Sequence, residues 1–278
     1  MSPLYVAARV ARRILPTTLP VWMRKALPFL DRNLGAADGA AIVRLYEKRM
    51  GAKKPANWPQ GLTVLEVGTG ATNGSCYELA ARGAKRALSL EPFVALNREK
   101  DAQQMAASGM QRDDLARNVE RLISTAQLPD GSVDCILSNS VLEHVTEPDA
   151  LFAELARLLR PGGFMLHIVD YRDHYFRYPY QFLTCSKKTW DRWLNPGDLP
   201  RWRISDHIAA LERAGLAVEV LLARPAPGWD TVKSKIHPEF AGYSEDALST
   251  GFGVLWAGVT KSGIELGANQ SWLTQPSA

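Results

Sequence analysis

The chain has 278 residues, of which 46% are hydrophobic and 22% are charged. These values exclude a disordered, collagen-like or disulfide-stapled protein. The length suits one large domain, or one domain with an elaboration, and it is enough to bury a sizeable core. The net charge of +4 is unevenly spread, because residues 1–30 carry five cationic side chains and no acidic one. The rest of the chain is nearly neutral, so we expect no nucleic acid as a partner.

The three cysteines, Cys76, Cys135 and Cys185, lie far apart in the sequence. They form no CxxC pair and no Cys/His spacing of the kind that binds metals, so the sequence predicts no metal site. Free thiols are typical of a reducing compartment, and we expect a cytoplasmic protein. No run of 18 apolar residues occurs, so no membrane span is predicted.

The segment 1–60 is predicted to be basic and helical, with proline-rich linkers and a second helix over residues 38–50. Residues 4–15 form an amphipathic pattern whose apolar face comprises Leu4, Ala7, Ala8, Ala11, Ile14 and Leu15, with Arg9, Arg12 and Arg13 opposite. One interpretation is a helix docked on its own domain with a solvated basic face. Another is a helix that makes peripheral contact with the inner membrane surface through residues 1–30. A transit peptide is a third.

From residue 61 to 262 the pattern alternates strands with helices. Strands are predicted at 63–67, 87–90, 119–123, 133–138, 164–169, 217–223 and 253–260, and helices near 74–82, 93–118, 148–159 and 205–214. This alternation predicts an α/β fold of the Rossmann-like, doubly wound type: a mostly parallel seven-stranded sheet with helices on both faces. The tail, residues 263–278, is polar and is predicted to be flexible.

One connection, residues 171–205, is far longer than the usual link between a strand and a helix, and it is rich in Tyr, Phe and Trp. A long aromatic insertion at the carboxyl end of a strand is where a lid or a substrate pocket would sit. A structural cap with its own small core is the other interpretation, and one segment can be both.

The most informative motif runs from a strand into a glycine turn, Val64-Leu65-Glu66-Val67-Gly68-Thr69-Gly70. In an open parallel sheet this first turn lies where ligands bind. A dinucleotide fingerprint needs a third glycine where Asn73 stands, and no Walker-type lysine follows. The carboxylate of Glu66 would repel phosphate and suits a cationic ligand. Glu91, at the end of the next strand, can accept both hydroxyls of a ribose.

A nucleoside with cationic groups and no phosphate is S-adenosylmethionine, and here the sequence resembles the class I S-adenosylmethionine-dependent methyltransferases. The resemblance covers residues 61–170 and, more loosely, the chain to about 260. It rests on the glycine turn, on Leu-Ser-Leu-Glu91, on the run from Leu128 to Val145 and on Leu158-Leu-Arg-Pro-Gly-Gly163, in that order. It implies a methyltransferase with S-adenosylmethionine as its cofactor.

The resemblance also implies a cofactor site. Gly68 and Gly70 would lie under the cofactor, Glu66 would hold its α-amino group, and Glu91 its ribose. The other expected contacts are Thr69, Pro92, Ser124, Thr125, Ala126, Asn139 and Ser140. Two positions depart from the family: Thr72 stands at the third small position of the turn, and Ser124 replaces an acid that contacts adenine. Main-chain groups around Thr125 and Ala126 would then hold the adenine.

The acceptor would be methylated by in-line transfer, which mainly requires alignment of the reactants. A hydroxyl acceptor must also lose a proton to a His or carboxylate within hydrogen-bond reach. His144 is the first candidate for this base, and His174 and Asp170 are the others. His167, inside the fifth strand, is expected to be a hydrogen-bonded core residue.

The run from His167 to Phe176 resembles bacterial methyltransferases associated with glycan and polysaccharide synthesis. This resemblance implies a sugar or glycan hydroxyl as the acceptor, and another small-molecule hydroxyl is the alternative. Two other functions stay open: a protein that binds S-adenosylmethionine without transferring methyl, and an NAD(P)-dependent oxidoreductase, which the spacing at Asn73 disfavours.

Overall fold

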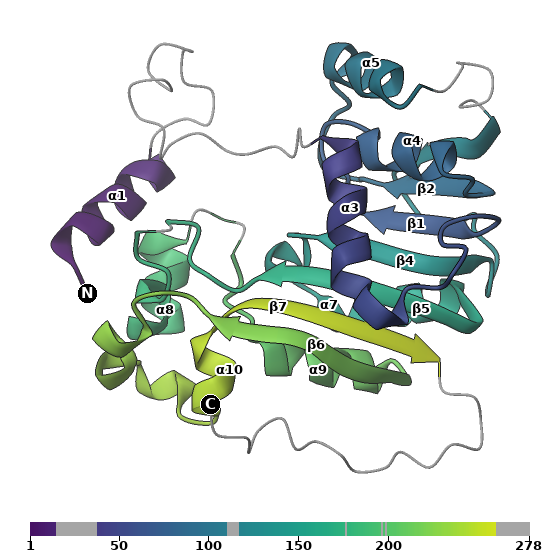
Figure 1. Ribbon diagram of the computed structural model, residues 1–278. Helices are drawn as coiled ribbons and strands as arrows, with labels where there is room; N and C mark the ends of the chain where they lie inside the picture. Colours follow the sequence, from purple (N-terminus) through teal and green to yellow (C-terminus); the bar gives the residue numbers. More distant parts are fainter. Residues whose placement is uncertain (15–37, 110–116, 176, 196, 198, 260–278) are drawn as a thin grey trace.

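Strands and helices alternate around one central sheet in the computed structural model (Figure 1). The structure describes residues 1–14, 38–109, 117–175, 177–195, 197 and 199–259. The predicted flexible tail and most of the predicted proline-rich linker lie outside these residues. Each of the seven predicted strands is present, with ends that differ from the prediction by a few residues.

The sheet has the strand order β3-β2-β1-β4-β5-β7-β6. Its strands are β1 (Thr63–Val67), β2 (Arg86–Leu90), β3 (Val119–Leu122), β4 (Val133–Asn139), β5 (Leu159–Asp170), β6 (Leu216–Pro225) and β7 (Thr250–Val259). Strands β1 to β5 pair in parallel, whereas β7 runs antiparallel to both β5 and β6. The mostly parallel prediction is confirmed, and the sheet is a mixed one. Antiparallel neighbours need no crossover to the opposite end of the sheet, so the β6–β7 connection stays at one end.

Helices cover both faces of the sheet, as the alternation predicts. On one face, α3 (Gly39–Met50) and α4 (Gly74–Ala81) bury Val43, Tyr46 and Leu79 against the strands. On the other, α7 (Pro148–Leu158) and α9 (Ile204–Arg213) bury Phe152 and Leu211. The stretch predicted as helix over 93–118 contains the shorter α5 (Arg98–Ala107), and residues 110–116 lie outside the described part.

The aromatic insertion forms a cap beyond the carboxyl ends of the strands. It contains the short helices α8 (Lys187–Thr189) and η5 (Trp190–Leu194), and it packs against α1 (Pro3–Ile14) and against the β6–β7 connection with α10 (Glu245–Ser249). These three segments share one hydrophobic cluster, whose largest members include Tyr5, Tyr180, Phe182, Trp190 and Phe240. The cap therefore has a core of its own, and its action as a lid stays a prediction.

Helix α1 is docked, but with a different face from the predicted one. Tyr5 and Arg9 are buried, whereas Leu4 is 53% exposed. The guanidinium of Arg9 forms an ion pair with the buried carboxylate of Asp173, which also accepts a hydrogen bond from the Tyr5 hydroxyl. The predicted solvated position of Arg9 is thus wrong, because helical spacing cannot reveal a buried acid more than a hundred residues away. Arg12 and Arg13 have no described side chains.

Within the described residues, none of the helices combines the length and the apolar character that crossing a bilayer requires. Peripheral contact of residues 1–30 with a membrane stays a prediction.

Candidate active site

The glycine turn follows β1 directly, at the carboxyl edge of the sheet. Gly68 and Gly70 have φ values of 76° and 69°, a left-handed conformation that glycine adopts without strain. A Cβ atom on Gly68 would lie 2.4 Å from Cγ2 of Val141, in the segment that follows β4. The turn therefore touches the segment after β4, and only glycine fits at this position.

Glu66 is a buried carboxylate at the end of β1. Its Oε1 accepts a hydrogen bond of 2.8 Å from the hydroxyl of Tyr46 on α3, and its Oε2 accepts one from Ser75 on α4. Burial raises the pKa of Glu66, and these hydrogen bonds oppose that shift. An ammonium group would compensate the buried negative charge, which fits the predicted role of Glu66.

A cavity of about 70 Å³ lies against Glu66 and the turn, with room for a small polar group. Its lining residues are Gly39, Ile42, Glu66, Gly68, Thr69, Thr72, Ser75 and Asn139. Four of the predicted cofactor contacts thus meet in one place: Glu66, Gly68, Thr69 and Asn139. A whole nucleoside would extend beyond the cavity along the edge of the sheet.

Glu91, at the end of β2, holds the turn from the other side. Its Oε2 accepts a hydrogen bond of 2.8 Å from the backbone N–H of Gly70, and its Oε1 accepts two of 3.0 Å, from Phe93 and Val94. An ionised carboxylate has about four acceptor positions, so these three hydrogen bonds leave about one for a ribose hydroxyl. Pro92 lies in the same turn and is exposed.

Arg121, on β3, braces the glycine turn and was not foreseen from the sequence. Its Nη1 donates to Thr69 Oγ1 at 3.2 Å and to Asn73 Oδ1 at 3.0 Å, and its Nη2 donates to the carbonyl of Gly70 at 2.7 Å. The alternation of β3 offered only a weak signal for which of its side chains point toward the turn.

Residues 124–126, the segment expected to hold adenine, can offer a ligand only some of their polar groups. Ser124 and Ala126 are exposed, and the Ser124 hydroxyl accepts a hydrogen bond of 3.2 Å from the N–H of Ala126. Thr125 is buried, and its hydroxyl donates to Glu154 on α7 at 2.5 Å. The hydroxyl of Thr125 is therefore already hydrogen-bonded within the domain. At this residue only the main-chain groups can bind a ligand.

The segment after β4 positions the acceptor side. Ser140 follows Asn139 with a φ of 56°, which is uncommon for a residue other than glycine and typical of functional sites. Its N–H donates to the carbonyl of Ile168 on β5 at 2.8 Å. The chain then forms the single turn η3 (Leu142–His144), which brings Glu143 and His144 to the edge of the sheet.

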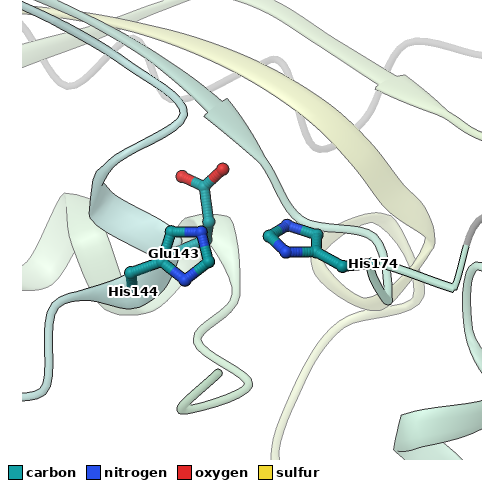
Figure 2. Close-up of side chains that lie close together, drawn as sticks. All are labelled: Glu143, His144 and His174. Carbon is teal, nitrogen blue, oxygen red and sulfur yellow. The ribbon is translucent and has the colours of Figure 1, made fainter. Parts of the chain in front are cut away.

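His144 and His174 meet although 30 residues separate them. Their ring centroids are 4.8 Å apart, with the rings edge to face. Figure 2 shows the carboxylate of Glu143 beside both rings, and the ligand atoms of the three residues lie within 4.8 Å of one another. The sequence pointed to both histidines and missed Glu143. An acid between apolar residues and a candidate base was the available signal.

Glu143 is only 4% exposed. Among the residues that the structure describes, neither of its carboxylate oxygens receives a hydrogen bond of normal geometry. Burial raises the pKa of Glu143 well above its usual range, although the nearby backbone N–H groups of Glu143 and Asp170 act to lower it.

Asp170, the third predicted candidate for the base, forms an ion pair with Arg172. Its two carboxylate oxygens accept hydrogen bonds from Arg172, at 2.8 Å from Nε and 2.7 Å from Nη2. This two-point ion pair engages both carboxylate oxygens within the domain. The two histidines are the better candidates.

His167 is a core residue, as expected. It is fully buried on β5, and its Nδ1 lies 2.8 Å from the Ser138 hydroxyl on β4. Burial lowers the pKa of His167 to about 3, so the ring is neutral near neutral pH.

Residues 65–167 match a family model described as a methyltransferase domain. The ubiquinone biosynthesis O-methyltransferase of Rhodopseudomonas palustris (strain BisB18) is 24% identical over 191 residues, which are 65% of this chain and 70% of that protein. An uncharacterized methyltransferase of Mycobacterium sp. (strain JLS) is 37% identical over 105 residues, 38% of this chain and 37% of that protein. A solved S-adenosylmethionine-dependent methyltransferase from Mesorhizobium loti has a TM-score of 0.45 and 18% identity, covering 81% of this chain and 99% of that one.

The Rossmann-like sheet, the glycine turn and the matching family model define a class I methyltransferase domain. The protein is an S-adenosylmethionine-dependent methyltransferase, and S-adenosylmethionine is its cofactor.

Proposed function

We propose that the protein methylates a hydroxyl oxygen of a small-molecule acceptor, and that His144 and His174 activate this hydroxyl. The observation that carries the proposal is the pair of imidazoles, 4.8 Å apart, at the carboxyl ends of β4 and β5. Several relatives are named O-methyltransferases, which supports an oxygen acceptor.

The chain's own residues would hold the cofactor along the edge of the sheet. Glu66 would bind the α-amino group at the cavity, and the glycine turn would lie beneath the methionine and ribose. Glu91 would accept a ribose hydroxyl while it keeps the turn in place. S-adenosylmethionine supplies a methyl group that its sulfonium already activates.

The histidines would act on the acceptor. Imidazole is the side chain best suited to exchange protons near neutral pH, so either ring can take up the proton that the hydroxyl loses. The exposed sides of both rings leave room for an acceptor, since His144 and His174 are only partly buried.

The kind of hydroxyl is the finer part of the proposal. A sugar was favoured because aromatic rings stack on sugar faces, but Tyr171, Tyr180, Phe182 and Trp190 are at most 2% exposed in the cap. These four rings stabilise the fold and offer no such platform, whereas the ring of Trp193 on η5 is 54% exposed and stays accessible. Relatives named for ubiquinone biosynthesis make hydroxylated aromatic rings an equal choice beside sugars.

Calorimetric titration with S-adenosylmethionine, S-adenosylhomocysteine and NAD tests the cofactor site. We expect both sulfur nucleosides to bind in the micromolar range and NAD to show no binding. Glu91→Ala should abolish binding, whereas Glu120→Ala, at an exposed acid of β3, should not. Binding of NAD alone would contradict the proposed site.

Methyl transfer to a panel of sugars and hydroxylated aromatic compounds tests the reaction. His144→Gln and His174→Gln should each lower kcat by about 10²–10⁴-fold with little change in cofactor affinity. Unchanged rates in both variants would exclude the histidines from the reaction.

A further inference from the structure

We propose that Glu143, His144 and His174 bind one divalent transition-metal ion, whose open coordination positions take oxygen atoms of the acceptor. The metal site stands on the geometry of these residues. The role toward the acceptor rests on the proposed function and makes it more specific.

The buried carboxylate of Glu143 is the first reason. Within the described part of the chain, both of its oxygens lack a hydrogen-bond partner, although the side chain is 4% exposed. A buried carboxylate without partners is costly, and a bound cation removes that cost. The nearby cation Arg172 is already held by the carboxylate of Asp170.

The second reason is convergence. The three side chains lie close together in Figure 2, and their ligand atoms lie within 4.8 Å of one another. Zinc bonds of about 2.1 Å in a tetrahedron place ligand atoms about 3.4 Å apart. The ligand atoms that lie farthest apart would have to approach by about 1.4 Å, a movement that side-chain rotation can supply.

The ligand set selects the kind of ion. Two imidazoles and one carboxylate suit Zn²⁺, Mn²⁺, Fe²⁺ or Co²⁺, whereas Ca²⁺ and Mg²⁺ prefer oxygen ligands alone. Three protein ligands leave positions open for other donors. Because both histidines are partly exposed, an ion and an acceptor can reach the site from the solvent side.

Such an ion would change how the hydroxyl is activated. A metal-bound hydroxyl loses its proton more easily, and the ion fixes the oxygen in place. The histidines would then hold the ion instead of taking the proton, and the proton would pass to solvent water at the exposed side of the site. Open positions next to one another favour acceptors with two neighbouring hydroxyls, such as a catechol or a vicinal diol of a sugar.

Cobalt binding tests the site without any need for activity. The full chain is treated with EDTA, freed of chelator and titrated with Co²⁺, and the visible absorption of the bound ion is followed. We expect one ion per chain, displaced by Zn²⁺. Glu143→Gln and His174→Gln should each weaken binding by at least about 100-fold. His237→Gln, at a histidine on the surface near Glu239, is the matched control and should bind as the wild type does.

The outcomes separate the metal site from the proposed function. Calorimetry with S-adenosylhomocysteine confirms that each variant is folded. Equal Co²⁺ affinity in Glu143→Gln, His174→Gln and His237→Gln, or no absorption in the wild type, would overturn the site. Full methyl transfer by EDTA-treated protein would refute the ion's role and leave O-methylation standing. Cobalt binding without methyl transfer to any hydroxyl would refute the proposed O-methylation and leave the metal site standing.

Discussion

At the scale of single residues, burial decides what each histidine can do. His167 and His207 are fully buried, and each has one ring nitrogen within 2.9 Å of a hydroxyl, of Ser138 and Tyr171 respectively. Burial lowers the pKa of both to about 3. His144 and His174 keep part of their surface exposed at the edge of the sheet. Two histidines are thus core residues, and two others are candidate site residues.

The buried histidines predict a dependence of stability on pH. Their pKa is about 3 in the folded protein and 6.5 in the unfolded chain, so the unfolded chain binds more protons between these values. Stability is fully present above pH 6.5 and falls as the pH drops toward 3. At pH 5 each buried histidine should lower the free energy of unfolding by about 2 kcal/mol relative to its value at pH 7.5.

Urea unfolding of the wild type and of His167→Gln at pH 7.5 and pH 5 isolates this effect, because other titrating groups act on both proteins alike. The wild type should lose about 2 kcal/mol more than the variant. His237→Gln serves as a control and should follow the wild type. Equal losses in wild type and His167→Gln would show that His167 is charged in the folded protein.

At the scale of elements, a buried ion pair adds to the hydrophobic contacts that dock α1 on the cap. Arg9 of α1 and Asp173 of the insertion are 2% and 0% exposed, and the Arg9 guanidinium lies 5.2 Å from the ring of Trp190. Asp173 immediately precedes His174, so the contact that docks α1 also anchors the loop that carries a candidate site residue.

Removing Arg9 should therefore release the helix. Arg9→Ala leaves the Asp173 carboxylate buried without its cation, beside two neutral donors, the Tyr5 hydroxyl and the backbone N–H of Tyr175, and we expect a loss of about 3–5 kcal/mol in the free energy of unfolding of the cap. Limited proteolysis should cut α1 sooner in the variant, and chemical denaturation should measure the loss. The double variant Arg9→Met/Asp173→Asn, which leaves no unpaired charge, should recover part of it. A fully stable Arg9→Ala protein would contradict the ion pair.

At the scale of the whole molecule, Arg203 joins the cap to the sheet domain. The side chain is fully buried at the start of α9. It donates to carbonyls of Tyr171 at 2.8 Å, Thr250 at 2.5 Å and Leu248 at 3.2 Å, and so links the insertion to the end of the β6–β7 connection. Burial lowers the pKa of Arg203 to about 10, which still leaves it charged near neutral pH.

Arg203→Leu should destabilise the whole protein by at least about 3 kcal/mol, because several buried carbonyls lose their donor at once. Thermal unfolding and urea unfolding measure the change. Arg213→Leu, which removes an exposed ion pair with Asp149, is the control and should cost at most about 1 kcal/mol. Equal effects of the two substitutions would mean that Arg203 does not hold the cap.

Much of the architecture could be predicted, because it depends on short, local patterns in the sequence. Short runs rich in β-branched and apolar residues, such as Thr63–Val67, mark strands that are buried on both faces. The glycines after β1 mark a turn that only glycine can make. The direction of β7 could not be predicted, because the pattern of a strand is the same whichever way it runs. Nor could the buried face of α1, because it depends on Asp173.

The candidate site divides in the same way. The sequence by itself determined the Rossmann-like domain, the glycine turn with its two acids, and His144 and His174 as candidates, because these depend on residues close together in the chain or on family motifs. Only the tertiary structure decided that Asp170 pairs with Arg172, that the largest rings of the cap are buried, and that Glu143 lies beside His144 and His174. Ion pairs, burial and convergence depend on distances through space between segments that are far apart in sequence, and no local pattern contains those distances.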